Sequence, residues 1–127
     1  FNFGAPETIP EKYNTPERKV ILHNPNITSL LATPDEMVWL GEYVADHVMK
    51  NPGPKAIYFP TLGLDRYMAE GGPWFGPDYL KPLFETIEKK VKGGDDEIQI
   101  TAMENHINDE EFAEAVVYKF LELWDQR

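Results

Sequence analysis

The chain of 127 residues is long enough for one domain with its own hydrophobic core and short for two independent domains. Its formal net charge of −10, from 22 acidic and 12 basic side chains, repels phosphodiester backbones, so we expect no nucleic-acid partner. Its apolar runs fall short of the roughly 20 residues that span a bilayer, so we expect no membrane partner either.

The sequence contains no cysteine, which excludes disulfides, thiolate catalysis and cysteine-type zinc sites. This absence is typical of a reducing compartment, and no signal peptide is visible, so we predict a cytoplasmic protein. The chain begins at Phe1 rather than methionine, from which we expect a fragment or a processed product.

The first segment has no helical or strand periodicity, because glycine and proline punctuate it throughout. Its apolar side chains, including Phe1, Phe3 and Tyr13, are unusual for a free linker, so we expect the segment to pack on another part of the protein. We therefore divide the chain into an N-terminal arm, residues 1–18, and an α/β domain, residues 19–127.

A short aliphatic run over residues 19–23 predicts a strand that is buried on both faces, as in a parallel sheet. The run ends in the motif H-N-P-N. Pro25 biases Asn24 away from helical geometry, so His23 and Asn24 are expected at the end of this strand.

A capping box predicts the first helix. Thr33 is followed by proline at the first helical position and by Glu36 three residues later, and residues 51–54 then end the helix with two prolines and a glycine. The predicted inward stripe consists of Met37, Leu40, Gly41, Val44, Ala45 and Val48.

The second strand is predicted over residues 55–60, and a long loop rich in glycine and proline follows over residues 61–77. Long loops without periodicity are uncommon in compact domains unless they are functional. Trp74 and Phe75 are then lid or interface side chains, or alternatively a satellite apolar cluster under the loop.

A second helix is predicted from Asp78 to the pair Gly93-Gly94, a third strand over residues 97–103, and a last helix capped by Asn108 with Glu111. The inward stripe of the second helix consists of Leu80, Leu83, Phe84, Ile87 and Val91. That of the last helix consists of Phe112, Ala115, Val116, Phe120 and Leu123.

This alternation of strands and helices predicts an α/β fold, a Rossmann-like three-layer β-α-β-α-β-α unit with a small parallel sheet and helices on both faces. The three strand ends are expected to open onto one edge of one sheet, where ligands collect in such folds. Because three strands make a small sheet, we expect another segment or another chain to complete it.

Ionisable and amide side chains gather at the predicted strand ends. His106 and His23 are candidate catalytic residues, because imidazole exchanges a proton near neutral pH. The candidate ligand-binding residues are Asn24, Asn26, Thr33, Glu36, Thr61, Gly63, Asn108 and Asp109. The alternative is that the asparagines are turn and cap residues and that both histidines satisfy loop carbonyls.

Other chemistries find less support in the sequence. His106 with Asp109, Glu104 or His23 would make a metal site, but no spacing puts two ligands on one helix face, so we predict no metal site. The only serine, Ser29, lies in no G-x-S-x-G elbow, and no Walker A motif is present.

Three motifs in one order, H-N-P-N-I-T from His23, T-P-D-E from Thr33 and H-I-N-D-x-x-F-A from His106, resemble the UPF0261 or Tm-1-like ATP-binding family. The resemblance begins at Asn2 and runs through Ala113. It is to the C-terminal portion of that family's domain, whose two halves are each Rossmann-like. The resemblance therefore implies that an N-terminal half is missing here.

The resemblance implies ATP, with Mg²⁺, as a cofactor, and a plant member of the family is an ATP-binding inhibitor of viral replication. This chain departs from the family pattern at three positions. Ala32 stands where the family has an arginine before the first helix, and Asp65 and Gly76 stand where a serine and an aspartate are expected. The arginine matters most, because it is the natural bidentate partner of phosphate or carboxylate.

Three functions follow as hypotheses. The first is binding of a small polar ligand or nucleotide at the carboxyl ends of the strands. The second is an enzyme of unassigned class that uses His106 or His23 as acid or base. The third is an oligomerisation or interaction module, suggested by the apolar arm and the aromatic last helix, with self-association or a partner that supplies the missing N-terminal half.

Overall fold

The computed structural model describes residues 1–95 and 97–125 and shows a mixed α/β fold with two separate sheets. The N-terminal sheet is antiparallel, with β1 (Asn2–Phe3), β3 (Ile27–Leu30) and β2 (Val20–Asn24) in that order. The second sheet pairs β4 (Ala56–Pro60) and β5 (Gln99–Met103) in parallel, with Tyr58 opposite Thr101. A small parallel sheet with helices was the predicted class, and it is confirmed.

The predicted place of the first strand is wrong. β2 pairs with β3 in the antiparallel sheet and does not join β4 and β5. The chain reverses just after β2, where the backbone N–H of Asn26 donates to Asn24 Oδ1 at 2.9 Å in an Asx turn. This local turn brings Ile27–Leu30 back along β2, so the strand finds its partner next to it in the sequence.

The arm contributes β1 and two short 3₁₀ helices, Pro6–Thr8 and Glu11–Tyr13. β1 pairs with β3, and the Tyr13 ring lies against Phe3 with 5.5 Å between the ring centroids. The arm therefore packs on the antiparallel sheet. The boundary between residues 18 and 19 stays a prediction.

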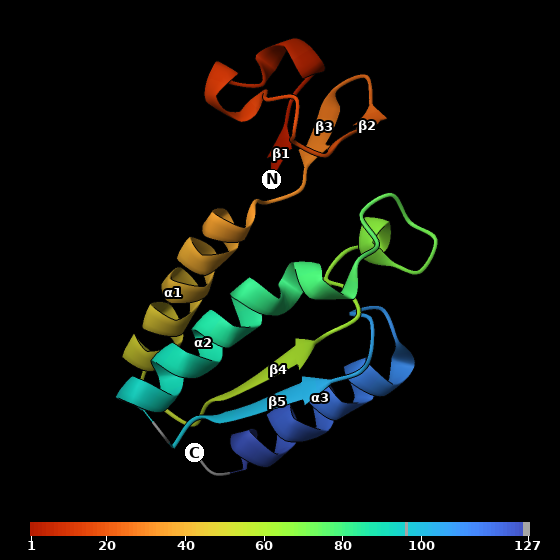
Figure 1. The fold of residues 1–127 in the computed structure, drawn as a ribbon. Coiled ribbons are helices and arrows are strands. Elements are labelled where there is room, and N and C mark those ends of the chain that lie inside the picture. The colour runs from red at the N-terminus through yellow and green to blue at the C-terminus, as the bar shows by residue number, and fades with distance from the viewer. Residues whose placement is uncertain (96, 126–127) are drawn as a thin grey trace.

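Three α-helices follow in the described chain: α1 (Pro34–Lys50), α2 (Lys81–Gly94) and α3 (Glu110–Trp124). In Figure 1, α1 lies beside α2, while α2 and α3 run on either side of the β4–β5 pair. None of the described helices is long and apolar enough to cross a membrane.

The core lies between α1, α2 and the parallel sheet, and both predicted helix stripes are confirmed there. The buried side chains of this core are Leu31, Met37, Ala45, Phe59, Trp74, Leu80, Leu83, Ile87, Val91 and Ile98. Gly41 lets the two helices approach closely, because a Cβ at this position would lie 2.9 Å from the backbone oxygen of Leu83. A helix pair packed this closely buries its apolar stripes efficiently.

The two predicted capping boxes have different outcomes. At α1 the box is confirmed, since Thr33 Oγ1 accepts from the Glu36 backbone and Glu36 accepts from the Thr33 backbone. At α3 the predicted box of Asn108 and Glu111 is wrong, because the helix begins at Glu110 with Asp109 as N-cap. The Asp109 carboxylate instead accepts from the backbone N–H of His106 at 2.7 Å, and so it closes the preceding turn.

Trp74 and Phe75, the two aromatic residues of the long loop after β4, lie in different environments. Trp74 is buried and meets Tyr67 edge to face, with 5.2 Å between the ring centroids. Phe75 is exposed. The loop is therefore anchored by its own apolar cluster around the short 3₁₀ helix Arg66–Met68.

Candidate functional site

The carboxyl ends of β4 and β5 continue as two joined loops. The backbone N–H of Thr61 donates to Met103 at 2.9 Å, and that of Ile107 donates to Gly63 at 2.9 Å. Gly63 has φ +150°, and a Cβ there would lie 2.6 Å from the His106 ring. Both observations require glycine at this position, because it lets the His106 ring pack directly on the backbone.

His106 holds this junction together through both of its ring nitrogens. Nδ1 accepts from the backbone N–H of Asn108 at 3.2 Å, and Nε2 lies 2.9 Å from the backbone oxygen of Asp65. Since Nδ1 is an acceptor, the proton belongs on Nε2, which then donates to Asp65. The half-buried ring therefore ties the β5–α3 junction to the loop that follows β4.

His23 reaches the same loop from the other sheet. Its Nδ1 lies 2.5 Å from the Tyr67 hydroxyl, and Asp65 caps the short helix of Tyr67 by accepting from the Tyr67 backbone at 2.6 Å. Both histidines thus contact the segment of residues 65–67, although His23 lies in β2 and His106 lies in the loop after β5. His23 is exposed, whereas His106 is half-buried.

A pocket of about 530 Å³, here called the strand-end pocket, opens beside Thr61 at the carboxyl end of β4. Its apolar walls include Phe59, Leu62, Leu80 and Phe84. Its charged lining consists of Asp78, Glu85, Glu88, Glu104 and Lys81, so four carboxylates face one ammonium group. This is the position where open α/β sheets bind their ligands.

The single cation of this pocket is already partly neutralised. Lys81 Nζ lies 2.6 Å from Asp78, and this hydrogen bond raises the pKa of Lys81 above its usual value. Thr61 turns its hydroxyl to the backbone, where Oγ1 donates to Met103 at 3.0 Å. The strand-end pocket therefore presents mostly acceptor groups to a ligand.

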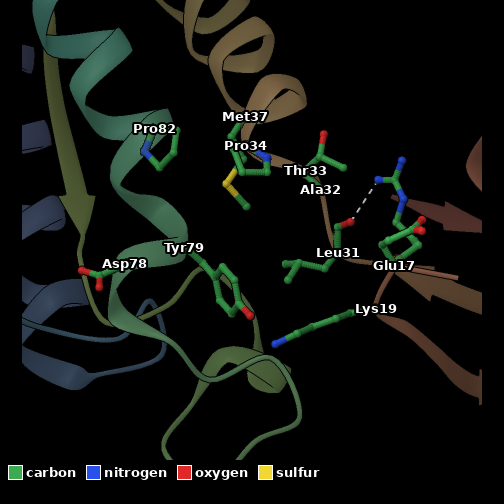
Figure 2. A pocket seen from close by; sticks show the side chains of 11 residues that line it. Glu17, Lys19, Leu31, Ala32, Thr33, Pro34, Met37, Asp78, Tyr79 and Pro82 are labelled. Carbon is green, nitrogen blue, oxygen red and sulfur yellow. Dashed lines mark hydrogen bonds between the residues drawn. The ribbon is translucent and has the colours of Figure 1, made fainter. Parts of the chain in front are cut away.

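A second pocket of about 310 Å³, here called the α1 pocket, lies where the N-terminal sheet meets the starts of α1 and α2. Figure 2 shows Leu31, Pro34, Met37 and Tyr79 around this space, with Lys19 reaching toward the Tyr79 ring. The Lys19 ammonium is 4.4 Å from the centroid of that ring, a cation–π contact. The α1 pocket is therefore mainly apolar, and its lining includes two cations, Lys19 and Arg18.

Arg18 closes the wall of the α1 pocket by holding Glu36. Its side chain is only 7% exposed, and its two guanidinium nitrogens lie 2.5 and 3.0 Å from the two Glu36 oxygens. The hydrogen bond from Arg18 holds the pKa of Glu36 below its usual value. Ala32 lines the same pocket. Arg18 thus places a bidentate guanidinium–carboxylate pair in the wall beside Ala32.

The structure distributes the predicted site residues over three places. His106, Gly63, Asn108 and Asp109 meet at the junction of the two loops, and Thr61 lies next to them in the strand-end pocket. Thr33 and Glu36 stand at the start of α1 beside the α1 pocket. Asn24 and Asn26 form the β2–β3 turn. Their roles in ligand binding or catalysis stay predictions.

Sequence reasoning missed several residues that the structure brings to these sites. Arg18 and Tyr67 belong to irregular segments, and Lys81 and Glu85 to the polar face of the predicted second helix. Only the fold places them against a pocket or a histidine. Arg18 lies before β2 and Glu36 lies in α1, so no local sequence pattern predicts their pairing. Within the described residues, no group of three or more His, Cys, Asp or Glu side chains could hold a metal ion.

The profile of the C-terminal domain of the uncharacterised protein family UPF0261 matches residues 1–124. The chain belongs to the UPF0261 family. Among its relatives is a UPF0261 protein of Rhizobium meliloti, 36% identical over 122 residues, which are 96% of this chain and 30% of that protein. A UPF0261 protein of Clostridium tetani is 32% identical over 125 residues, 98% of this chain and 30% of that protein.

A more distant relative is the tomato protein Tm-1(GCR237) of Solanum lycopersicum, which is named a ToMV resistance protein. It is 27% identical over 122 residues, which are 96% of this chain and 16% of that protein. This UPF0261 chain therefore spans less than a third of the length of the relatives it matches.

Proposed function

We propose that this UPF0261 chain binds a small polar ligand in the strand-end pocket. The observation that carries the proposal is the position of the pocket at the carboxyl end of β4, beside the start of α2 and next to Glu104 after β5. Ligands of open α/β folds lie at this edge because the backbone there is free of strand pairing. Apolar walls with a few convergent polar groups are typical of ligand sites.

The charge of the pocket favours one class of ligand. Four carboxylates outnumber the single Lys81 in the lining. Asp78 pairs with Lys81 and Glu88 with Lys92, which leaves Glu85 and Glu104 to a ligand. A ligand that carries amino or hydroxyl groups can donate to these oxygens, whereas a triphosphate is repelled by them. We therefore propose an amine- or hydroxyl-bearing ligand. ATP with Mg²⁺, which the family resemblance suggested, would need cations from outside the described residues.

The hydrogen bonds of His106 support binding rather than proton transfer as the function of this region. Both ring nitrogens are engaged with backbone groups, and a catalytic role requires at least one of them to face a substrate. His23 is exposed and pairs with Tyr67, and neither residue lines the strand-end pocket. Catalysis by either histidine stays a separate prediction.

Calorimetric titration tests the proposal with two probes of opposite charge, spermidine and ATP with Mg²⁺. The proteins are the isolated chain and a full-length chimera in which this chain replaces the matched segment of the Rhizobium meliloti protein. We expect spermidine to bind and ATP to give no heat. Glu104→Gln should weaken spermidine binding about fivefold, equivalent to ~1 kcal/mol for one lost charge.

Glu114→Gln is the matched control, because Glu114 is exposed on α3 and does not line the pocket. Both substitutions remove one negative charge, so a general effect of net charge would weaken binding equally in the two variants. Binding of ATP without spermidine would reverse the proposed ligand class. The absence of heat from both probes in both proteins would remove the ligand proposal.

A further inference from the structure

The outer edge of β4 is uncovered, although β4 runs along the core. Within the described chain β4 pairs only with β5, and its other edge has no partner strand. A free edge presents unpaired N–H and C=O groups, which readily pair with another strand. Parallel sheets are rarely left with so few strands, because independent stability needs three or more strands or extensive cover.

The backbone geometry of β4 shows which groups this free edge offers. The N–H of Thr61 points to β5, where it donates to Met103 at 2.9 Å. Backbone groups of successive residues in a strand alternate between its two edges, so Ala56, Tyr58 and Pro60 direct theirs outward. Pro60, the last residue of β4, has no N–H to offer, so the proposed pairing uses the N–H groups before it. The backbone N–H groups of Ala56 and Tyr58 remain as donors at the outer edge of β4.

An apolar groove of about 420 Å³ follows the same edge between β4 and α3. Its lining includes Ala56 and Tyr58 of β4 and Phe112, Val116 and Phe120 of α3, but no residue of β5. The groove therefore lies on the outer side of β4, where an added strand would place its side chains.

The flank of α3 beside this groove is also apolar and uncovered. Val116, Val117, Phe120 and Leu121 recur at helical spacing on one side of α3, and the last three are 55%, 55% and 52% exposed. A continuous exposed apolar surface of this kind marks an interaction site.

A strand from the same polypeptide is favoured over a second molecule as the cover of this β4 edge. The segment that matches this chain makes up only 30% of the Rhizobium meliloti relative, so most of a UPF0261 protein lies outside it. A strand from the same polypeptide binds without the translational entropy cost of association. A second copy of this chain is opposed by its net charge of −10.

We propose that the outer edge of β4 receives a parallel strand from the portion of a UPF0261 protein outside these residues. The side chains of that strand fill the groove between β4 and α3, and its adjoining helix covers Val117, Phe120 and Leu121. β4 then becomes an interior strand, and the carboxyl end of the added strand lies next to Thr61. This inference does not depend on which ligand the strand-end pocket binds.

The test compares the full-length chimera with the isolated chain. Phe120→Glu places a charge on the proposed contact surface, and Tyr118→Glu is the matched control, because Tyr118 is 69% exposed and does not line the groove. We expect Phe120→Glu to lower the melting temperature of the chimera by several degrees and Tyr118→Glu to leave it within about one degree. In the isolated chain both variants should melt close to the parent.

Hydrogen exchange provides a second readout that needs no substitution. The amides of Ala56 and Tyr58 should exchange about tenfold or more slowly in the chimera than in the isolated chain. Equal effects of the two substitutions in the chimera, or equal exchange in both proteins, would overturn the proposal. So would a dimer of the isolated chain that Phe120→Glu dissociates, because a second copy would then occupy the edge. If the chimera fails to fold, the same substitutions at the matching positions of the unmodified Rhizobium meliloti protein decide the question.

Discussion

Helices α2 and α3 both pack on the parallel sheet, but they bury their apolar residues to different extents. α2 buries Leu83, Ile87 and Val91, and Val91 has no exposed surface at all. α3 buries only Phe112, while Phe120 and several of its neighbours are exposed. The difference is that α2 lies between the sheet and α1, whereas α3 has only the sheet (Figure 1).

This comparison shows that an apolar stripe predicts burial only where a second surface exists to receive it. The stripe of α2 matches α1 closely enough that Gly41 is needed at the contact. The apolar residues of α3 extend round one flank beyond the part that meets β4. The exposed apolar residues of α3 are the surface on which the proposed strand and helix would pack.

The largest expected effect comes from truncating a buried side chain of α2. Leu83→Ala should lower the free energy of unfolding by about 2 to 5 kcal/mol, because it leaves a cavity in a packed core. Leu121→Ala on α3 should change it by less than about 0.5 kcal/mol in the isolated chain. Urea unfolding followed by circular dichroism measures both. Similar losses for the two variants would mean that α3 is buried in solution, and hence that the chain self-associates.

The close contact of α1 with α2 gives the next largest effect. Gly41→Ala should destabilise the chain by about 1 to 3 kcal/mol, because its Cβ would overpack against Leu83 and Thr86. Gly93→Ala should stabilise it by about 0.5 to 1 kcal/mol, because nothing lies within 4 Å of a Cβ there. Thermal unfolding of the two variants tests this contrast. Stabilisation by Gly41→Ala would show that the helices can separate without cost.

At the start of α3, His106 joins the helix to the rest of the sheet. His106→Ala should cost about 1 to 3 kcal/mol of stability, because the Asp65 carbonyl and the Asn108 amide lose their partner. His23→Ala should cost less, because His23 is exposed. Urea unfolding gives both values, and spermidine titration of the folded variants follows. Loss of binding with unchanged stability would instead assign His106 to a ligand site.

The smallest effect concerns the anchored start of α1 and depends on pH. Arg18 lowers the pKa of Glu36 from its ordinary 4.5, so the pair stabilises the fold above that pH. This stability is lost as the pH falls through the lower pKa of the folded state. Arg18→Met should therefore lower the free energy of unfolding by about 1 kcal/mol at pH 7, and by less as the pH falls. This magnitude lies between those of exposed and buried ion pairs, because the pair is partly buried.

Melting temperatures between pH 3 and pH 7 measure this dependence. Lys92→Gln is the control, because its ion pair with Glu88 is exposed and should contribute little. Parallel pH curves for Arg18→Met and the parent chain would show that the pair does not stabilise the fold.

Features that depend on neighbours in the sequence were predictable. The capping box of Thr33 and Glu36 needs only three-residue spacing, and the stripe of Leu83, Ile87 and Val91 needs only helical periodicity. The parallel pair β4–β5 followed from strands separated by a helix. The candidate site was predictable in part, since Gly63, His106, Asn108 and Asp109 do meet.

The partners of these elements depend on the three-dimensional fold. β2 has the composition of a buried parallel strand, yet it pairs with β3, because a two-residue turn brings that partner closer than any distant strand. Arg18 reaches Glu36 from the irregular segment before β2, because a hydrogen bond between such distant residues depends on where the chain returns in space. Local periodicity and capping in the sequence predicted the three α-helices and the strands β2, β4 and β5, whereas β1 and β3 were not predicted. Which surfaces the helices and strands bury depends on which other elements lie against them in the folded chain.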